Sequence, residues 1–165
     1  MKDATPADIA LESARAICTE GIALAAQGQH TQALKKYDAV IAQFSLRRKA
    51  GFAQVLTTAM YNKSTVLSKL ERNEESVAAY SALIKRYAET NESRAALIVA
   101  QAMRNKAYRL NALGRADESI ATYEAMVAQF GESTDPEISE TTSPVKAFLA
   151  ERQAVLDARE QAARA

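Results

Sequence analysis

Three ten-residue stretches of this 165-residue chain decide its fold: GQHTQALKKY at residues 28–37, ERNEESVAAY at 71–80 and GRADESIATY at 114–123. Each begins 43 residues after the one before, and they align without a gap. The agreement continues on both sides, with Leu24, Leu67 and Leu110 upstream, and Ile41, Ile84 and Val127, then Phe44, Tyr87 and Phe130, downstream. A fixed period of this length indicates a stacked array of identical supersecondary units.

Each unit is predicted to contain two helices. In the shorter helix, apolar residues such as Leu34, Tyr37, Ile41 and Phe44 follow one another at steps of three, four and three, which is one face of an amphipathic helix. A longer helix precedes it, and small residues stand where the two should cross closely: Gly21, Ser64 and Ala107. Capping signals then predict helices over residues 6–27, 31–44, 46–70, 74–88, 92–112, 117–130 and 144–162.

A polar break over residues 131–143 is expected to be a loop, with at most one helical turn between residues 136 and 140. Ser143 followed by Pro144 is typical of a helix start, which places a last helix over 144–162. That helix carries apolar residues at Val145, Phe148, Leu149 and Leu156. We expect it to be a capping helix, since an array of repeats must cover its final apolar face.

Composition argues against several functional classes. The 21 Lys and Arg balance 20 Asp and Glu, which gives no basic excess for nucleic acid or an anionic membrane. No stretch approaches the ~20 apolar residues that a membrane span needs, and no signal-type segment opens the chain. We therefore expect a cytoplasmic protein, or a domain of a longer chain. His30 and Cys18 are the sole histidine and cysteine, so we predict no metal, no cofactor and no enzyme activity.

The repeated positions resemble the tetratricopeptide signature: Gly21, Leu24, Gly28, Ala33 and Tyr37 in the first unit, with counterparts in the next two. The phrases MYNK at 60–63 and MRNK at 103–106 are similar to a bacterial class with longer repeats. The resemblance implies an all-α, right-handed α-solenoid of three antiparallel helix pairs plus a C-terminal capping helix. It would form one domain over residues 1–165, with repeats at about 6–44, 46–88 and 92–130.

The resemblance also implies a concave groove lined by the longer helices and a role in binding peptides or partner subunits. Residues of these helices that point away from the partner helix are the candidate binding residues: Tyr61, Asn62, Thr65, Lys69, Gln101, Arg104, Asn105 and Tyr108. An asparagine amide offers both a donor and an acceptor to a peptide backbone. Tyrosines are frequent anchors at interfaces, and Arg104 or Lys69 could meet an acidic group.

The corresponding residues of the first long helix include Cys18, Thr19 and Ile22. These replace the lysine and asparagine with which some family members clamp a C-terminal carboxylate, so that clamp is not expected here. We predict a scaffold for protein or peptide binding. The alternative is self-assembly into a homo-oligomer, and an enzyme is a third hypothesis that no motif supports. The placement of Val145, Phe148, Leu149 and Leu156 discriminates the first two: if they cover the last repeat, the end is closed and assembly is disfavoured, and if the helix points away, an apolar end is open to another copy.

Overall fold

The structure, a computed structural model, describes residues 4–47 and 51–164, and every regular element in these ranges is a helix. The expectation of an all-helical chain is therefore confirmed. The seven helices are α1 (Pro6–Ala26), α2 (His30–Phe44), α3 (Phe52–Lys69), α4 (Asn73–Tyr87), α5 (Ser93–Ala112), α6 (Ala116–Phe130) and α7 (Pro136–Arg164).

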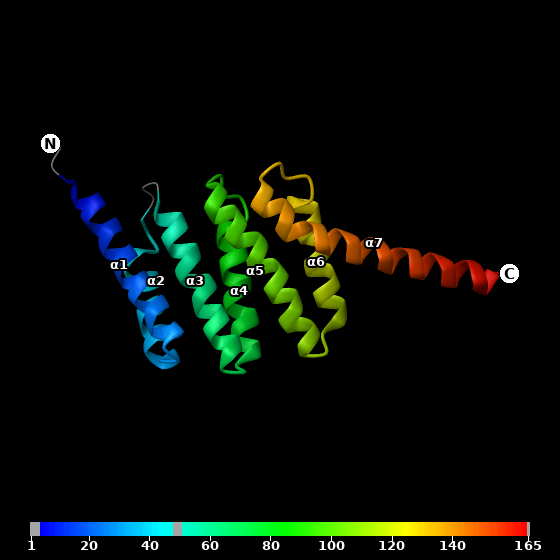
Figure 1. The fold of residues 1–165 in the computed structure, drawn as a ribbon, viewed down its shortest axis with the longest axis horizontal. Coiled ribbons are helices and arrows are strands. Elements are labelled where there is room, and N and C mark those ends of the chain that lie inside the picture. Colours follow the sequence, from blue (N-terminus) through cyan, green and yellow to red (C-terminus); the bar gives the residue numbers. More distant parts are fainter. Residues whose placement is uncertain (1–3, 48–50, 165) are drawn as a thin grey trace.

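The helices follow one another from one end of the molecule to the other in chain order (Figure 1). Helix α1 packs on α2, α3 on α4, and α5 on α6, and each pair also contacts the next through α2 with α3 and α4 with α5. The longer helices form a second series of contacts, α1 with α3, α3 with α5, and α5 with α7. Helix α3 thus contacts both α1 and α5, and α5 contacts both α3 and α7.

The turn that joins the two helices of a pair has the same geometry three times. The amide nitrogens of Gln29, Arg72 and Arg115 donate to the carbonyl oxygens of Leu24, Leu67 and Leu110 at 2.9, 3.0 and 2.9 Å. This hydrogen bond, from an amide to the carbonyl oxygen five residues earlier, is typical of helix C-termini at which the residue before the donor has a left-handed conformation. That residue is Gly28 (φ 75°), Glu71 (φ 59°) and Gly114 (φ 76°) in turn.

Within each pair, the small residue of the longer helix allows close packing. A Cβ added to Gly21 would lie 2.8 Å from Cε1 of Tyr37, so only glycine fits without a shift. Its counterparts Ser64 and Ala107 are fully buried, as expected. There the shorter helix adds a hydrogen bond, because the hydroxyls of Ser76 and Ser119 donate to the carbonyl oxygens of Ser64 and Ala107, each at 2.8 Å.

Consecutive pairs are joined by a second recurring contact. Arg86, near the end of α4, donates to the carbonyl oxygen of Ser45, the residue that follows α2. Gln129, near the end of α6, donates to the carbonyl oxygen of Ala88, the residue that follows α4. The donors and the acceptors are each 43 residues apart, so the same contact recurs from α4 to the end of α2 and from α6 to the end of α4. The apolar core consists of two clusters, and Tyr87 packs against both.

The prediction of a loop over residues 131–143 is wrong for most of this range, because α7 begins at Pro136. The carboxylate of Asp135 accepts from the amides of Glu137 and Ile138 at 3.0 and 3.3 Å, and so caps the helix eight residues earlier than expected. Ser143, the expected cap, lies inside the helix and donates its hydroxyl to the carbonyl of Ser139 at 2.7 Å.

The second long helix also begins later than the expected residue 46. Gly51 precedes Phe52 with a φ of 88°, and a right-handed helix cannot run through a left-handed residue. Ser45 ends α2. Arg47 precedes α3, and Arg48 and Lys49, which fall in the expected range 46–70, lie outside the described residues.

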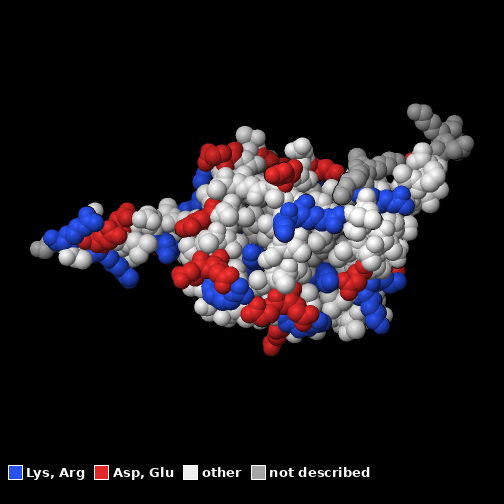
Figure 2. All heavy atoms as spheres, turned by 180° about the vertical axis from the view of Figure 1, so that it is seen from behind, with Lys and Arg blue, Asp and Glu red and all other residues white. Residues whose placement is uncertain are grey.

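Helix α7 covers the last pair with its first half only. Val145 is buried, and Leu149 packs against the core formed with α5 and α6. Beyond this point the helix continues away from the other six (Figure 1), and Val155 is 47% exposed. Figure 2 shows this projection from behind, with acidic and basic side chains side by side on it and on the body of the molecule.

Candidate functional site

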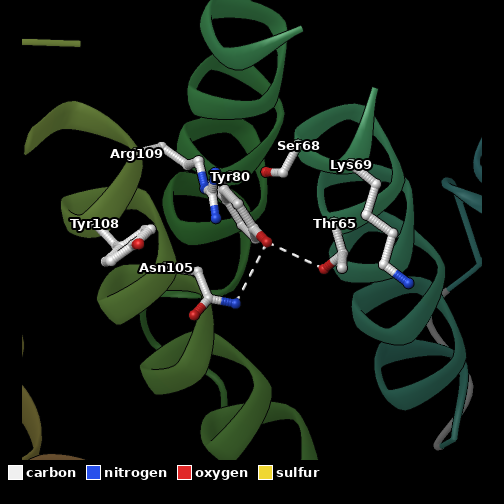
Figure 3. A pocket seen from close by; sticks show the side chains of 7 residues that line it. All are labelled: Thr65, Ser68, Lys69, Tyr80, Asn105, Tyr108 and Arg109. Carbon is white, nitrogen blue, oxygen red and sulfur yellow. Dashed lines mark hydrogen bonds between the residues drawn. The ribbon is translucent and has the colours of Figure 1, made fainter. Parts of the chain in front are cut away.

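A pocket of about 240 Å³ lies between α3 and α5, and the side chain of Tyr80 from α4 forms its floor (Figure 3). Helix α3 contributes residues one turn apart, and α5 contributes residues at the same level on the facing side. The lining consists of Thr65, Ser68, Lys69, Tyr80, Asn105, Tyr108 and Arg109. We call it the first pocket.

Hydrogen bonds fix the floor of the first pocket. The hydroxyl of Thr65 lies 3.1 Å from the carbonyl oxygen of Tyr61 and 3.1 Å from the hydroxyl of Tyr80. The amide nitrogen of Asn105 donates to the hydroxyls of Tyr61 (2.9 Å) and Tyr80 (3.4 Å). Its oxygen points away from Tyr80 in Figure 3. Asn105 therefore offers an acceptor to a ligand, while its donor is already used.

The electrostatics of the first pocket favour negative charge. Burial raises the pKa of Tyr80, and its hydrogen bonds with Thr65 and Asn105 offset part of the rise. The hydroxyl therefore stays neutral. Lys69 and Arg109 supply two positive charges, and no residue that lines this pocket is acidic. The guanidinium of Arg109 also lies 4.8 Å from the ring centre of Tyr108, a cation–π distance.

A larger and more apolar second pocket, of about 470 Å³, adjoins the first one between α5, α6 and α7. Phe148 meets the ring of Tyr123 edge-on, with 5.8 Å between the ring centres. Tyr108 lines both pockets and is 60% exposed, so it stands between them as an accessible aromatic surface. The lining consists of Arg104, Tyr108, Asn111, Ser119, Ile120, Tyr123, Pro144, Val145 and Phe148.

A third hollow, of about 510 Å³, lies where α5 faces the first turns of α7. Gln101 and Arg104 line it together with Arg94, Glu137 and other residues of α7. Arg94 and Glu137 form an ion pair across it at 2.9 Å. This hollow is the most polar of the three and already contains both signs of charge.

The structure brings four of the eight sequence-predicted residues into the first pocket, namely Thr65, Lys69, Asn105 and Tyr108. Arg104 lines the second pocket and the third hollow, and Gln101 lines the third. Tyr61 and Asn62 line none of the three.

Tyr61 supports the first pocket from behind. Its ring packs edge-on against Tyr80 at 5.9 Å, and its hydroxyl accepts from Asn105. The expectation that Asn105 presents both a donor and an acceptor needs correction, because the neighbouring tyrosines use the donor. Asn62 is half-buried.

Several pocket residues were not among the sequence-predicted ones. Tyr80 was assigned to the buried stripe of its helix, and it is buried, but its hydroxyl reaches through to the pocket. The signal for it was the tyrosine at the same place in every repeat, at residues 37, 80 and 123. Arg109 and Ser68 each adjoin a predicted residue. The apolar contribution of Phe148 depends on where α7 lies, which no local pattern gave.

Cys18, placed by its register on the groove face, is 4% exposed and packs in the core of the first three helices. Burial raises its pKa to about 11, so it remains a protonated thiol near neutral pH. In residues 4–47 and 51–164 no cluster of three or more His, Cys, Asp or Glu side chains is arranged to hold a metal ion. Over the same residues, no helix combines the length and apolar character needed to cross a membrane.

Comparison of the chain with protein-family models, and with curated proteins, gives no match.

Proposed function

We propose that this chain is a protein-interaction scaffold of the tetratricopeptide-like kind, a right-handed α-solenoid of three antiparallel helix pairs closed by α7. It would bind a peptide or partner segment along α3, α5 and α7, without catalysis and in the bacterial cytoplasm. The recurring turns and the contacts between successive longer helices support the architecture. The observation that carries the binding role is the pair of adjoining pockets on either side of Tyr108.

The chemistry of these pockets suits an extended segment better than a small molecule. A backbone in extended form alternates donors and acceptors, and the pocket rim presents both, with Lys69 and Arg109 as donors and the Asn105 oxygen as acceptor. Tyr108 adds an exposed aromatic surface at the centre, where interface anchors concentrate. Both pockets are open at the surface and adjoin, so a continuous chain can occupy them together.

The test begins with a phage-displayed library of random linear peptides selected on the immobilised full chain. One enriched peptide is then synthesised and titrated against purified variants by fluorescence anisotropy. We expect Tyr108→Ser to weaken binding at least about tenfold, since burying an aromatic anchor commonly contributes more than 1.4 kcal/mol.

The matched control is Ile9→Ser on α1, because Ile9 is also 60% exposed but lies on the helix farthest from α7. It should leave the affinity unchanged, and circular dichroism should be the same for both variants. Equal loss in the two variants, or no selectable peptide, would refute groove binding.

A second candidate function is self-assembly through the projecting end of α7. Glu151, Val155 and Arg159 follow one another at steps of four residues, and all three line one hollow along this part of α7. If two copies of this helix pair antiparallel about Val155, Glu151 of each copy faces Arg159 of the other. Both pairs of charges are then complementary, which would favour a two-fold dimer.

Light scattering over a concentration series tests this second function. Glu151→Arg should reduce dimerisation by placing like charges opposite each other, and the double variant Glu151→Arg with Arg159→Glu should restore it. A wild-type chain that stays monomeric at high concentration would exclude assembly through α7.

A further inference from the structure

The first and second pockets occupy equivalent places in consecutive repeats. Four residues of the first pocket have counterparts 43 positions later in the second: Thr65 and Tyr108, Ser68 and Asn111, Tyr80 and Tyr123, Asn105 and Phe148. A tyrosine of the shorter helix forms the floor in both cases. The two pockets are thus one feature that occurs in two consecutive repeats. Their walls differ in residue type, and these differences determine which chemical group each pocket can bind.

The walls differ in polarity. In the first pocket, Thr65 and Asn105 hydrogen-bond the floor tyrosine. In the second pocket, Tyr108 and Phe148 replace them, and Phe148 meets the floor tyrosine with its ring instead. Ile120 and Val145 complete an apolar wall there. The second pocket is also about twice as large, 470 against 240 Å³, so it admits a large apolar side chain.

Among the residues that the structure describes, the two cations of the first pocket have no carboxylate partner, and Arg109 contacts only the ring of Tyr108 as a cation–π pair. Among the described residues, Lys69 and Arg109 form no ion pair, whereas Arg72, Arg115 and Lys63 each contact a carboxylate at 3.0 Å or less. None of the residues that line either pocket is Asp or Glu. Two unpaired cations beside a neutral hydrogen-bonded floor favour an anionic group from another molecule.

We infer that the bound segment is a peptide in which a carboxylate contacts Lys69 and Arg109 while a large apolar side chain fills the second pocket, with Tyr108 between the two. This inference rests on the proposed scaffold function and names the chemistry of its ligand. The guanidinium of Arg109 binds the carboxylate through its N–H groups, and Lys69 adds charge from the facing helix. Burial of the apolar side chain against Phe148 and Ile120 supplies the second contact.

The same peptide selection tests this chemistry. Sequences enriched on the wild-type chain should share Asp or Glu together with Phe, Leu or Trp at a fixed separation. Replacing the acid by its amide in a selected peptide should weaken binding about tenfold or more, because charge-assisted hydrogen bonds are the stronger ones. Raising the salt concentration should weaken the acidic peptide more than its amide form.

Charge reversal provides the matched comparison. The double variant Lys69→Glu with Arg109→Glu should lose the acidic peptide and gain affinity for the same peptide with Lys in place of the acid. Lys85→Glu, an exposed charge reversal on α4, should do neither. Phe148→Ser should weaken binding of the parent peptide but cause little further loss in a peptide whose apolar residue is already Ala.

These experiments distinguish a failure of the proposed ligand chemistry from a failure of the scaffold function. If selected peptides bind, depend on Tyr108, and yet ignore the charge reversal or lack an acidic residue, the ligand chemistry is wrong and the scaffold function stands. If no peptide is enriched on the wild-type chain, both are overturned.

Discussion

Glu71 is the residue of this chain whose replacement tests the repeat most directly. It takes the left-handed position of the turn between α3 and α4 with φ 59°, where the equivalent turns have Gly28 and Gly114. A left-handed conformation costs a residue with a Cβ about 1–2 kcal/mol. Across residues 4–47 and 51–164, the exposed Glu71 side chain has no ion pair or hydrogen bond that would offset this.

We therefore expect Glu71→Gly to stabilise the protein. Glycine removes the cost of the left-handed backbone but loses more entropy on folding, about 0.5–1 kcal/mol, so the midpoints of the two ranges leave a net gain of about 0.75 kcal/mol. In a chain of this size that corresponds to a rise in melting temperature of about 1–4 °C. Thermal and urea unfolding followed by far-UV circular dichroism measure the change.

Two further variants separate the backbone effect from the loss of charge. Glu71→Ala removes the carboxylate but keeps the left-handed residue, so its stability should stay close to wild type. Gly114→Ala imposes the same cost on the next turn and should destabilise by about 1 kcal/mol; no atom lies within 4 Å of the added Cβ, so the cost is conformational. If Glu71→Gly is no more stable than Glu71→Ala, the turn is not under backbone strain and the reasoning fails.

Three other outcomes are expected. Gly21→Ala should lower the free energy of unfolding by about 1–3 kcal/mol, since the new methyl group would lie 2.8 Å from the Tyr37 ring; urea denaturation that leaves stability unchanged would mean the pair relaxes freely. Ser119→Ala should cost about 1 kcal/mol by removing the buried hydrogen bond to the Ala107 carbonyl, and a neutral result in the same assay would show that this bond contributes nothing. Cys18 should react with a disulfide reagent at about pH 8 much more slowly in the folded than in the unfolded chain, because burial raises its pKa to about 11; equal rates would contradict its burial.

The positions of the first six helices could be predicted from local signals. Apolar periodicity placed the shorter helices, and the turn residues placed the ends of the longer ones, so the bounds agree within one residue except where α3 begins. That start depends on Gly51, which the sequence pattern did not single out. A glycine is compatible with many conformations, so its φ of 88° could not be predicted from the sequence; in the structure, Leu11 of α1 lies 3.1 Å from the position that a Cβ on Gly51 would occupy.

The start of α7 shows why two equal local signals were not enough. Asp135 before Pro136 and Ser143 before Pro144 are both cap-plus-proline pairs. The earlier pair is the one that caps, and the turns between them bury Ile138 and Thr142 in contact with the rest of the fold. Burial of these two side chains offsets the cost of a proline inside the helix, a balance that depends on neighbours distant in sequence.

The repeat and the positions of its helices were contained in the sequence, because helices are made by hydrogen bonds between residues at most a few positions apart. Which hydrogen-bonding groups of Asn105 remain available to a ligand could not be predicted from the sequence. Its partners Tyr61 and Tyr80 lie 44 and 25 residues away along the chain, and they take up the donor that a local reading left available to a ligand. The direction of α7, and with it the apolar pocket around Phe148, likewise depends on packing between distant segments, where burial outweighs local preference.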